Sequence, residues 1–209
     1  MAGALMACEM QPAETLDYPR VLALRLEPAE PVPGETHSAT ALTFETGALT
    51  WSLCEEAWTP ALTCPSGALT LGEGNPISFT FPDLESAWLK AEAEGASPAV
   101  KLVEVDSGAT NPTTASLVGK DGPLPPSVEP EAEVALRVDL GGLTDEAKAE
   151  LVVSWYVTAG TLEPAKTLAT EEAILTAPTS GSVRIVAVIR EQAGGTTWTE
   201  ATLTVGANP

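Results

Sequence analysis

Apolar and polar residues alternate along many short segments of the chain, and turns rich in glycine and proline separate most of these segments. In segment 20–28, for example, Leu22, Leu24 and Leu26 share one face, with polar or small residues between them. A period of two is typical of a β-strand with one buried face, and proline or glycine between such segments ends each strand. The pattern predicts strands within the following segments: 20–28, 36–45, 48–54, 76–81, 101–105, 114–119, 133–140, 151–158, 182–191 and 196–205.

Two segments have a helical pattern instead. In 82–95, Leu84, Ala87, Trp88 and Ala91 fall on one helical face, while Asp83 and Gly95 suit the two ends. We expect a short helix here, packed on the edge of the first sandwich. A single helical turn is also expected in 143–150, capped by Thr144.

The chain is long enough for two domains, because 209 residues exceed the roughly 100–150 of a typical domain. Four prolines in 121–130 indicate a semi-rigid linker, part of which could pair as the first strand of the second domain. Trp51 and Trp155 hold similar places in the two halves. We therefore predict an all-β tandem repeat of one sandwich fold, with a tether in 1–19 and domains in 20–122 and 123–209.

The net charge of the chain disfavours some classes of binding partner. The chain has 29 Asp and Glu against 10 Lys and Arg, for a net charge of −19. Such a field repels phosphate backbones and anionic lipid headgroups, so we expect no binding to nucleic acid. No apolar run approaches the roughly 18 residues of a membrane-spanning helix, so any membrane attachment is expected to be covalent or through a partner.

Three sequence stretches resemble a known group of domains. VSWYVTAGTLEP (153–164), EEAILTAP (171–178) and GSVRIVAVIREQAGGTTWTEATLTV (181–205) are similar to bacterial immunoglobulin-like and PKD-like β-sandwich domains. The first half matches less closely, through EPAEPVPGE (27–35) and the later Trp51. The resemblance implies two tandem immunoglobulin-like sandwiches, the first with one short helix, and places both tryptophans between sheets.

The stretch LMAC (5–8) resembles the lipobox of bacterial lipoproteins, with Leu5 three residues before the cysteine and Ala7 directly before it. This resemblance implies a diacylglyceryl anchor on Cys8 and a cell-envelope protein of Gram-negative bacteria, outer membrane-anchored, periplasmic or extracellular. The segment before Cys8 has no basic residue and is short for a secretory signal. Either an apolar, basic extension in frame upstream of Met1 completes the signal, or the resemblance is accidental and the N-terminus is merely apolar.

With Cys8 acylated, Cys54 and Cys64 make an even pair, as an oxidising compartment favours. Because Trp51 is expected to face inward, Cys54 at the same strand's end should point away from the core. A disulfide closing loop 55–63 would contribute about 2.5–3 kcal/mol in the chain-entropy model. A free, buried cysteine pair is the alternative, and two cysteines do not supply the four ligands of a zinc site.

We expect no catalytic residue, no metal and no cofactor. His37 is the only histidine, it lies beside turn sequence, and no G-x-S-x-G motif is present. Neighbouring acidic pairs, such as Glu171 with Glu172, are expected to be exposed and solvated rather than to form a glycosidase pair. Segment 104–111 has oxygen ligands suited to calcium but lacks the EF-hand spacing.

Trp58 is the strongest candidate for a ligand contact, because it lies in the cysteine loop beside Glu55 and Glu56. A tryptophan on a closed loop can stack on a sugar or insert into a protein partner, although it can equally cover the end of the sandwich. We predict a non-enzymatic envelope lipoprotein for structural display, adhesion or binding of a surface protein or glycan. The alternative is a carbohydrate-binding module or accessory domain that uses the loop around Trp58.

Overall fold

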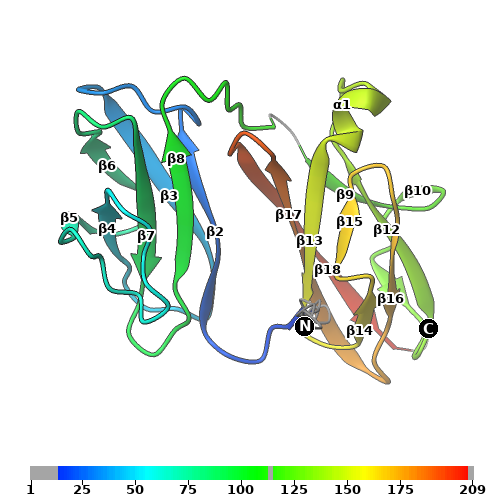
Figure 1. Ribbon diagram of the computed structural model, residues 1–209. Coiled ribbons are helices and arrows are strands. Elements are labelled where there is room, and N and C mark those ends of the chain that lie inside the picture. The colour runs from blue at the N-terminus through cyan, green and yellow to red at the C-terminus, as the bar shows by residue number, and fades with distance from the viewer. Residues whose placement is uncertain (1–13, 113–114, 207–209) are drawn as a thin grey trace, which may run out of the picture.

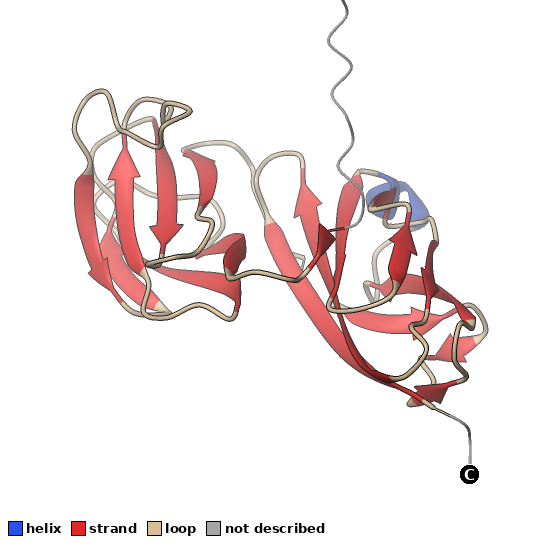
Figure 2. Cartoon of the chain, turned by 90° about the horizontal axis from the view of Figure 1, so that it is seen from below, coloured by secondary structure: helices blue, strands red, loops and turns tan. Residues whose placement is uncertain are grey.

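The computed structural model describes residues 14–112 and 115–206, which form two β-sandwich units and one short helix (Figure 1). Figure 2 shows the units side by side, joined through extended segments. The predicted all-β class and the tandem arrangement of two sandwiches are confirmed. Within the described residues, no helix has the length and apolar character that crossing a bilayer requires.

The first unit contains a three-stranded sheet, β2-β3-β6, and a four-stranded sheet, β5-β4-β7-β8. This division is that of an immunoglobulin-like sandwich in which the fourth strand pairs with the third instead of the fifth. The strands are β2 (Arg20–Glu27), β3 (Thr36–Phe44), β4 (Thr50–Cys54), β5 (Leu69–Glu73), β6 (Ile77–Thr80), β7 (Ser86–Glu92) and β8 (Ala99–Glu104).

The second unit contains the sheets β10-β9-β12-β16-β14 and β1-β13-β17-β18-β11, with β15 also paired to β13. Its central strands again follow the immunoglobulin-like order. The strands are β1 (Glu14–Thr15), β9 (Ser116–Gly119), β10 (Gly122–Pro123), β11 (Ser127–Val128), β12 (Glu133–Asp139), β13 (Leu151–Val157), β14 (Thr161–Glu163), β15 (Lys166–Leu168), β16 (Ala173–Thr176), β17 (Gly181–Glu191) and β18 (Thr196–Val205).

Each unit has its own core with a tryptophan at its centre. Trp51 is 0% exposed and Trp155 is 1% exposed. The Trp51 indole donates to the main-chain oxygen of Gly74 at 2.7 Å, and the Trp155 indole donates to Thr167 Oγ1 at 2.9 Å. Both polar handles are therefore satisfied while the rings supply large apolar contact area, as the repeat of Trp51 and Trp155 predicts.

The helix expected in 82–95 is wrong, because this segment contains strand β7. Ala87, Leu89 and Ala91 point into the core with a period of two, and β7 is paired on both sides, with β4 and β8. A short apolar run fits either period, and sheet pairing decided between them. The one short helix of the described fold is α1 (Asp145–Ala149) in the second unit, where Thr144 Oγ1 accepts from the Ala147 N–H as predicted.

A bulge changes the predicted face of Leu22. Pairing between β2 and β3 shifts register between Val21 and Ala23, so Leu22 leaves the face that Leu24 and Leu26 share. An extra residue in one strand reverses the alternation beyond it. The predicted common face for all three leucines is therefore wrong at Leu22.

Segment 114–119, expected as a closing strand of the first sandwich, belongs to the second. Its strand β9 pairs with β12 from Leu136↔Gly119 to Asp139↔Ser116. Part of the predicted linker also pairs, since β10 adds to β9 and β11 runs parallel to β18. The chain therefore leaves the first sandwich after β8 and enters the second at β9, ahead of the predicted domain boundary between 122 and 123.

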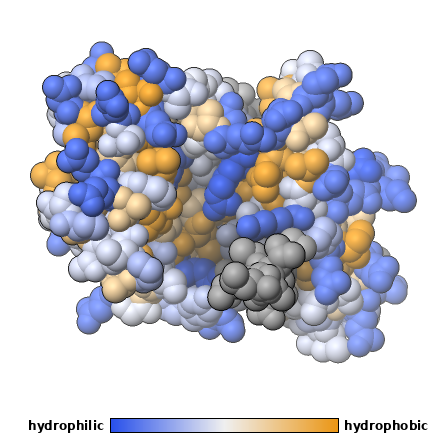
Figure 3. Space-filling view, viewed as in Figure 1, coloured by the Kyte–Doolittle hydropathy of each residue, from blue (hydrophilic) through white to orange (hydrophobic). Residues whose placement is uncertain are grey.

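An apolar cluster joins the two units. Val186 and Val188 lie on the face of β17 that points away from the core of their own unit, yet both are 0% exposed. They pack in one cluster with Leu16, which precedes β2, and with four side chains of the first unit: Leu22, Ala23, Leu42 and Phe44. Outside this cluster, Figure 3 shows a furrow between the units on one face.

The N-terminal part of the described chain also contacts the second unit. Strand β1 pairs in parallel with β13, and the Leu16 N–H donates to the Val157 main-chain oxygen at 2.7 Å. The expectation of an unpaired tether up to residue 19 is therefore wrong for residues 14–16, because a two-residue strand is too short to show a period. The chain touches the second unit before it enters the first.

Candidate functional site

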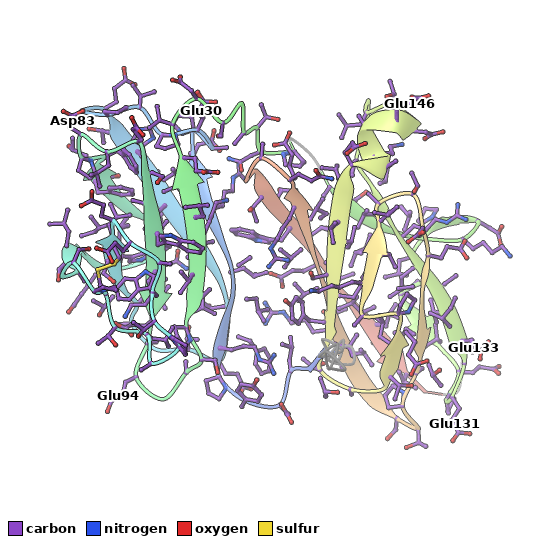
Figure 4. The ribbon with its side chains drawn as sticks, viewed as in Figure 1. Glu30, Asp83, Glu94, Glu131, Glu133 and Glu146 are labelled. Atoms are coloured by element: carbon purple, nitrogen blue, oxygen red, sulfur yellow. A yellow bond between two sulfur atoms is a disulfide. The ribbon has the colours of Figure 1, made fainter. Side chains whose placement is uncertain are left out.

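A disulfide closes the predicted loop of the first unit. Cys54, at the end of β4, bonds to Cys64 with 5.7 Å between the two Cα atoms. Figure 4 shows this disulfide as a yellow bond at the outer edge of the first unit, on the side away from the second. We name residues 55–63, which the disulfide encloses, the stapled loop.

The stapled loop has hydrogen bonds of its own. The Thr59 N–H donates to the Thr63 main-chain oxygen at 3.0 Å, and the two hydroxyls lie 2.8 Å apart. The Leu62 N–H donates back to Thr59 at 2.8 Å, with Leu62 in the left-handed region at φ 57°. Disulfide and turn together hold the loop in one shape without a helix or strand.

Trp58 folds back onto the outer face of β7. Its indole N–H donates to the main-chain oxygen of Trp88 at 3.3 Å. The Nζ of Lys90 lies 4.2 Å from the centroid of the Trp58 ring and 2.9 Å from Glu92 Oε1. A cation over the face of a tryptophan is attracted by the ring quadrupole, so Lys90 occupies one ring face and Trp58 is half-buried.

The acidic members of the predicted contact, Glu55 and Glu56, are exposed and form no ion pair with any residue that the structure describes. Leu62, in the same loop, is 38% exposed, and Leu69, at the start of the edge strand β5, is 52% exposed. The stapled loop thus places two carboxylates, the open part of an indole and an aliphatic side chain on one short segment. Their role as ligand contacts stays a prediction.

His37 has a structural role in the first unit. His37 is buried, and its Nε2 accepts the Val32 N–H at 3.1 Å. Its ring centroid lies 6.4 Å from that of Phe79 and 6.2 Å from that of Phe81. His37 thus supports the turn that precedes β3.

In segment 104–111, which has oxygen ligands suited to calcium, the side-chain amide of Asn111 forms hydrogen bonds with main-chain groups of both units. Asn111 Nδ2 donates to the Leu26 main-chain oxygen at 2.7 Å, and its Oδ1 accepts the Thr196 N–H at 2.9 Å. Across residues 14–112 and 115–206, no three His, Cys, Asp or Glu side chains are grouped to hold a metal ion. Cys8, the predicted lipid site, lies outside the described residues.

No protein-family model matches the chain, and no curated protein matches it. Among solved structures, it is similar to a nucleoside hydrolase-related protein from Saccharophagus degradans, at 15% identity and a TM-score of 0.35, over 50% of this chain and 28% of that one. The adhesin InvE of Yersinia pseudotuberculosis matches at 14% identity and a TM-score of 0.30, over 87% and 58%. The fibronectin(III)-like modules of Clostridium thermocellum CbhA match at 12% and 0.32, over 88% and 94%. The chain thus spans less than two thirds of the first two proteins.

Sequence reasoning missed the contact between Lys90 and Trp58. It also missed the packed contact between the two units, which we call the joint. If 82–95 is interpreted as a helix, Lys90 is not expected to lie opposite the stapled loop. The joint had a signal, because residues 185–189 are apolar without interruption. A strand buried on both faces has such a pattern, and Val186 and Val188 are the residues that the second face buries.

Proposed function

We propose that this protein is a non-enzymatic component of a cell envelope, lipid-anchored through Cys8, that displays two immunoglobulin-like sandwiches and binds a partner through the stapled loop. The observation that carries the proposal is the place of this loop. It is closed by a disulfide on the edge of the first unit that faces away from the second. A rigid, outward loop suits binding because little conformational entropy remains to be lost.

The position of Glu14 limits how far the second unit would lie from an anchor at Cys8. Strand β1 holds Glu14 against β13, and six residue steps separate Glu14 from Cys8. An extended chain spans up to about 20 Å over that distance. An anchor at Cys8 would therefore keep the second unit close to the bilayer and leave the stapled loop, on the far side of the first unit, accessible. The net charge of −19 opposes binding to anionic headgroups, so attachment depends on the acyl chains, of which two or more give stable anchoring.

Metabolic labelling tests the anchor. Growing cells that express the full chain are expected to incorporate labelled palmitate into it, and Cys8→Ser should abolish the label. The matched control replaces both other cysteines, Cys54→Ser with Cys64→Ser, and should keep the label. Equal labelling of the wild type and Cys8→Ser would contradict the anchor.

Site-specific crosslinking tests the binding surface. A photoreactive residue at Ala57, which is exposed in the stapled loop, is expected to give a discrete crosslinked species on intact cells. The same residue at Glu94, which projects from the lower end of the first unit (Figure 4), serves as the control. The product at Ala57 should disappear with Trp58→Ala. Identical products at both positions would contradict a binding role for the loop.

A carbohydrate ligand is the second candidate, and the exposed part of the Trp58 indole is the observation that favours it. Lys90 covers one face of the indole, so a sugar would have to stack on the rest of the ring. A glycan array decides between the candidates, with binding lost in Trp58→Ala expected for a glycan site. An array without any signal, with Trp58→Ala changing only stability, would leave the protein-partner proposal.

A further inference from the structure

A pocket of about 410 Å³ lies between the two units, apart from the stapled loop. Its walls come from β2, the start of β8 and the hairpin between β17 and β18. This volume is within the range of small-molecule sites, and sites between packed units are common. Three ionisable side chains line the pocket: Lys101, Arg190 and Glu191.

The cationic side chains of Lys101 and Arg190 donate hydrogen bonds to neutral groups. Lys101 Nζ donates to the main-chain oxygen of Gly194, to Thr196 Oγ1 at 2.9 Å and more weakly to the main-chain oxygen of Leu24 at 3.5 Å. Lys101 therefore bridges the two units. It forms no ion pair with a carboxylate of the described chain.

Arg190 keeps unused donors. Its Nη1 donates to Ser154 Oγ at 2.9 Å and its Nη2 to the Leu22 main-chain oxygen at 3.2 Å. A guanidinium has five N–H groups in a planar fork, and within the described residues the other three have no acceptor. The one acid of the pocket is engaged elsewhere, since Glu191 Oε2 accepts the Thr110 N–H at 2.8 Å.

The pocket therefore has a net positive charge in a chain whose overall charge is −19. Burial, with a further contribution from the positive charge of Arg190, lowers the pKa of Lys101 to about 8. Two cations held together in a partly dehydrated place repel each other, and an anion between them would offset both charges. The planar fork of arginine matches the oxygens of carboxylate and phosphate groups.

We propose that the pocket between the units binds a small oxyanion, a carboxylate- or phosphate-bearing molecule, through the guanidinium of Arg190 and the ammonium of Lys101. This site does not depend on the lipid anchor or on the stapled loop. An oxyanion bound there contacts both sandwiches and stabilises their arrangement. Its affinity falls as the pH rises from 7 to 9, because Lys101 loses its proton in that range. The other charged side chains that line the pocket are Arg190 and Glu191.

The test uses the full chain with inorganic phosphate and succinate as separate probes, at constant ionic strength set with chloride. The expected result is saturable binding by calorimetry, a rise in Tm, and an affinity roughly tenfold lower in Arg190→Gln, since hydrogen bonds to charged groups are among the stronger ones. Arg184→Gln is the matched control, because Arg184 is on the same strand but pairs with Glu200 at 2.7 Å. Comparison of the two probes shows which oxyanion the site prefers.

A second measurement covers the case in which Arg190→Gln does not fold. The pKa of Lys101, followed by NMR in the wild-type chain, is expected to rise when the bound oxyanion is present. An equal affinity in wild type and Arg190→Gln would mean an adventitious ion only and would overturn the proposal. So would the absence of saturable binding together with an unchanged pKa of Lys101.

Discussion

The side-chain oxygen of Asn111 accepts the backbone N–H of Thr196 at 2.9 Å, and this bond links the connecting segment to the second unit. The nitrogen of the same amide donates to the main-chain oxygen of Leu26, in the first unit, at 2.7 Å. One side chain thus holds the edges of two sandwiches. Together with the apolar cluster around Val186 and Val188, it makes the joint a packed interface and not a free hinge.

Asn111→Ala is expected to destabilise this joint. The substitution leaves the N–H of Thr196, a buried residue, without an acceptor, and an unsatisfied buried donor costs about 1–3 kcal/mol. Asn111→Asp keeps the acceptor but loses the donor to Leu26, so it should fall between Ala and the wild type. Urea denaturation measures the free energy of unfolding of all three proteins. Three equal values would show that the amide does not support the joint.

Gly195→Ala tests the same joint from the hairpin side. A Cβ at Gly195 would lie 1.7 Å from the main-chain oxygen of Thr110 in the connecting segment, a distance that forces the backbone to move. We expect a loss of about 1–3 kcal/mol, as for other overpacked sites, and faster hydrogen exchange in 105–112. Gly47→Ala is the control, since no atom lies within 4 Å of the added Cβ. Equal Tm values for the two variants would contradict close packing at Gly195.

The disulfide is expected to stabilise the first unit. Replacing Cys54 and Cys64 together by alanine should lower the free energy of unfolding by about 2.5–3 kcal/mol, because a ten-residue separation closes a short loop in the unfolded chain. Hydrogen exchange should speed up in the stapled loop and at β4, with β12 and β16 of the second unit little changed. Unaltered stability of the double variant would show that the hydrogen bonds of the loop suffice without the disulfide.

Trp155 and Thr167 offer a cleaner test of one buried hydrogen bond. Thr167→Val has nearly the same shape but removes the acceptor of the Trp155 indole N–H, and both residues are buried. The expected loss is about 1–3 kcal/mol. Thr167→Ser keeps the hydroxyl but loses a buried methyl group, so a larger loss in Val than in Ser means that the hydrogen bond contributes more than the methyl group. The tryptophan fluorescence midpoint in urea reports it, and a smaller loss in Val than in Ser would be inconsistent with this role.

The alternation of apolar residues predicted most strands because each sandwich buries one face of each strand. The inward sets around Trp51, Phe79, Leu136 and Trp155 follow directly from a period of two. The errors arose where tertiary structure overrides that period: a bulge at Leu22 and strand pairing on both sides of β7. The contact between the units left one local signal, the uninterrupted apolar run 185–189, which indicates a strand buried on both faces but not what covers its second face.

Only part of the candidate site was predictable from the sequence. Once Cys8 was set aside as the lipid site, cysteine parity favoured a bond between Cys54 and Cys64 over a free pair, and the structure contains this bond. The position of Lys90 over Trp58 was not, because it depends on how a loop folds over a strand 30 residues away. The pocket at Lys101 and Arg190 was hidden for the same reason, since its walls come from both units.

The contribution of Lys101 to the free energy of unfolding depends on pH, and linkage gives the sign of this dependence. Burial and the nearby charge of Arg190 lower the pKa of Lys101 to about 8 in the folded chain, from 10.5. Between these pH values the unfolded chain binds a proton that the folded chain does not, so the contribution of Lys101 to stability rises with pH. Below pH 8 both states are protonated and this contribution is at its lowest and constant.

We therefore expect the free energy of unfolding of the wild type to rise relative to that of Lys101→Met by about 1–3 kcal/mol between pH 7.5 and 10. Urea denaturation of both proteins across this range measures the difference, in which groups common to both cancel. Because Lys101→Met also loses the bonds to Gly194 and Thr196, its stability is expected to be lower at every pH, but with a different slope. Parallel curves for the two proteins would show that the ammonium of Lys101 has its ordinary pKa and that the space between the units is well hydrated.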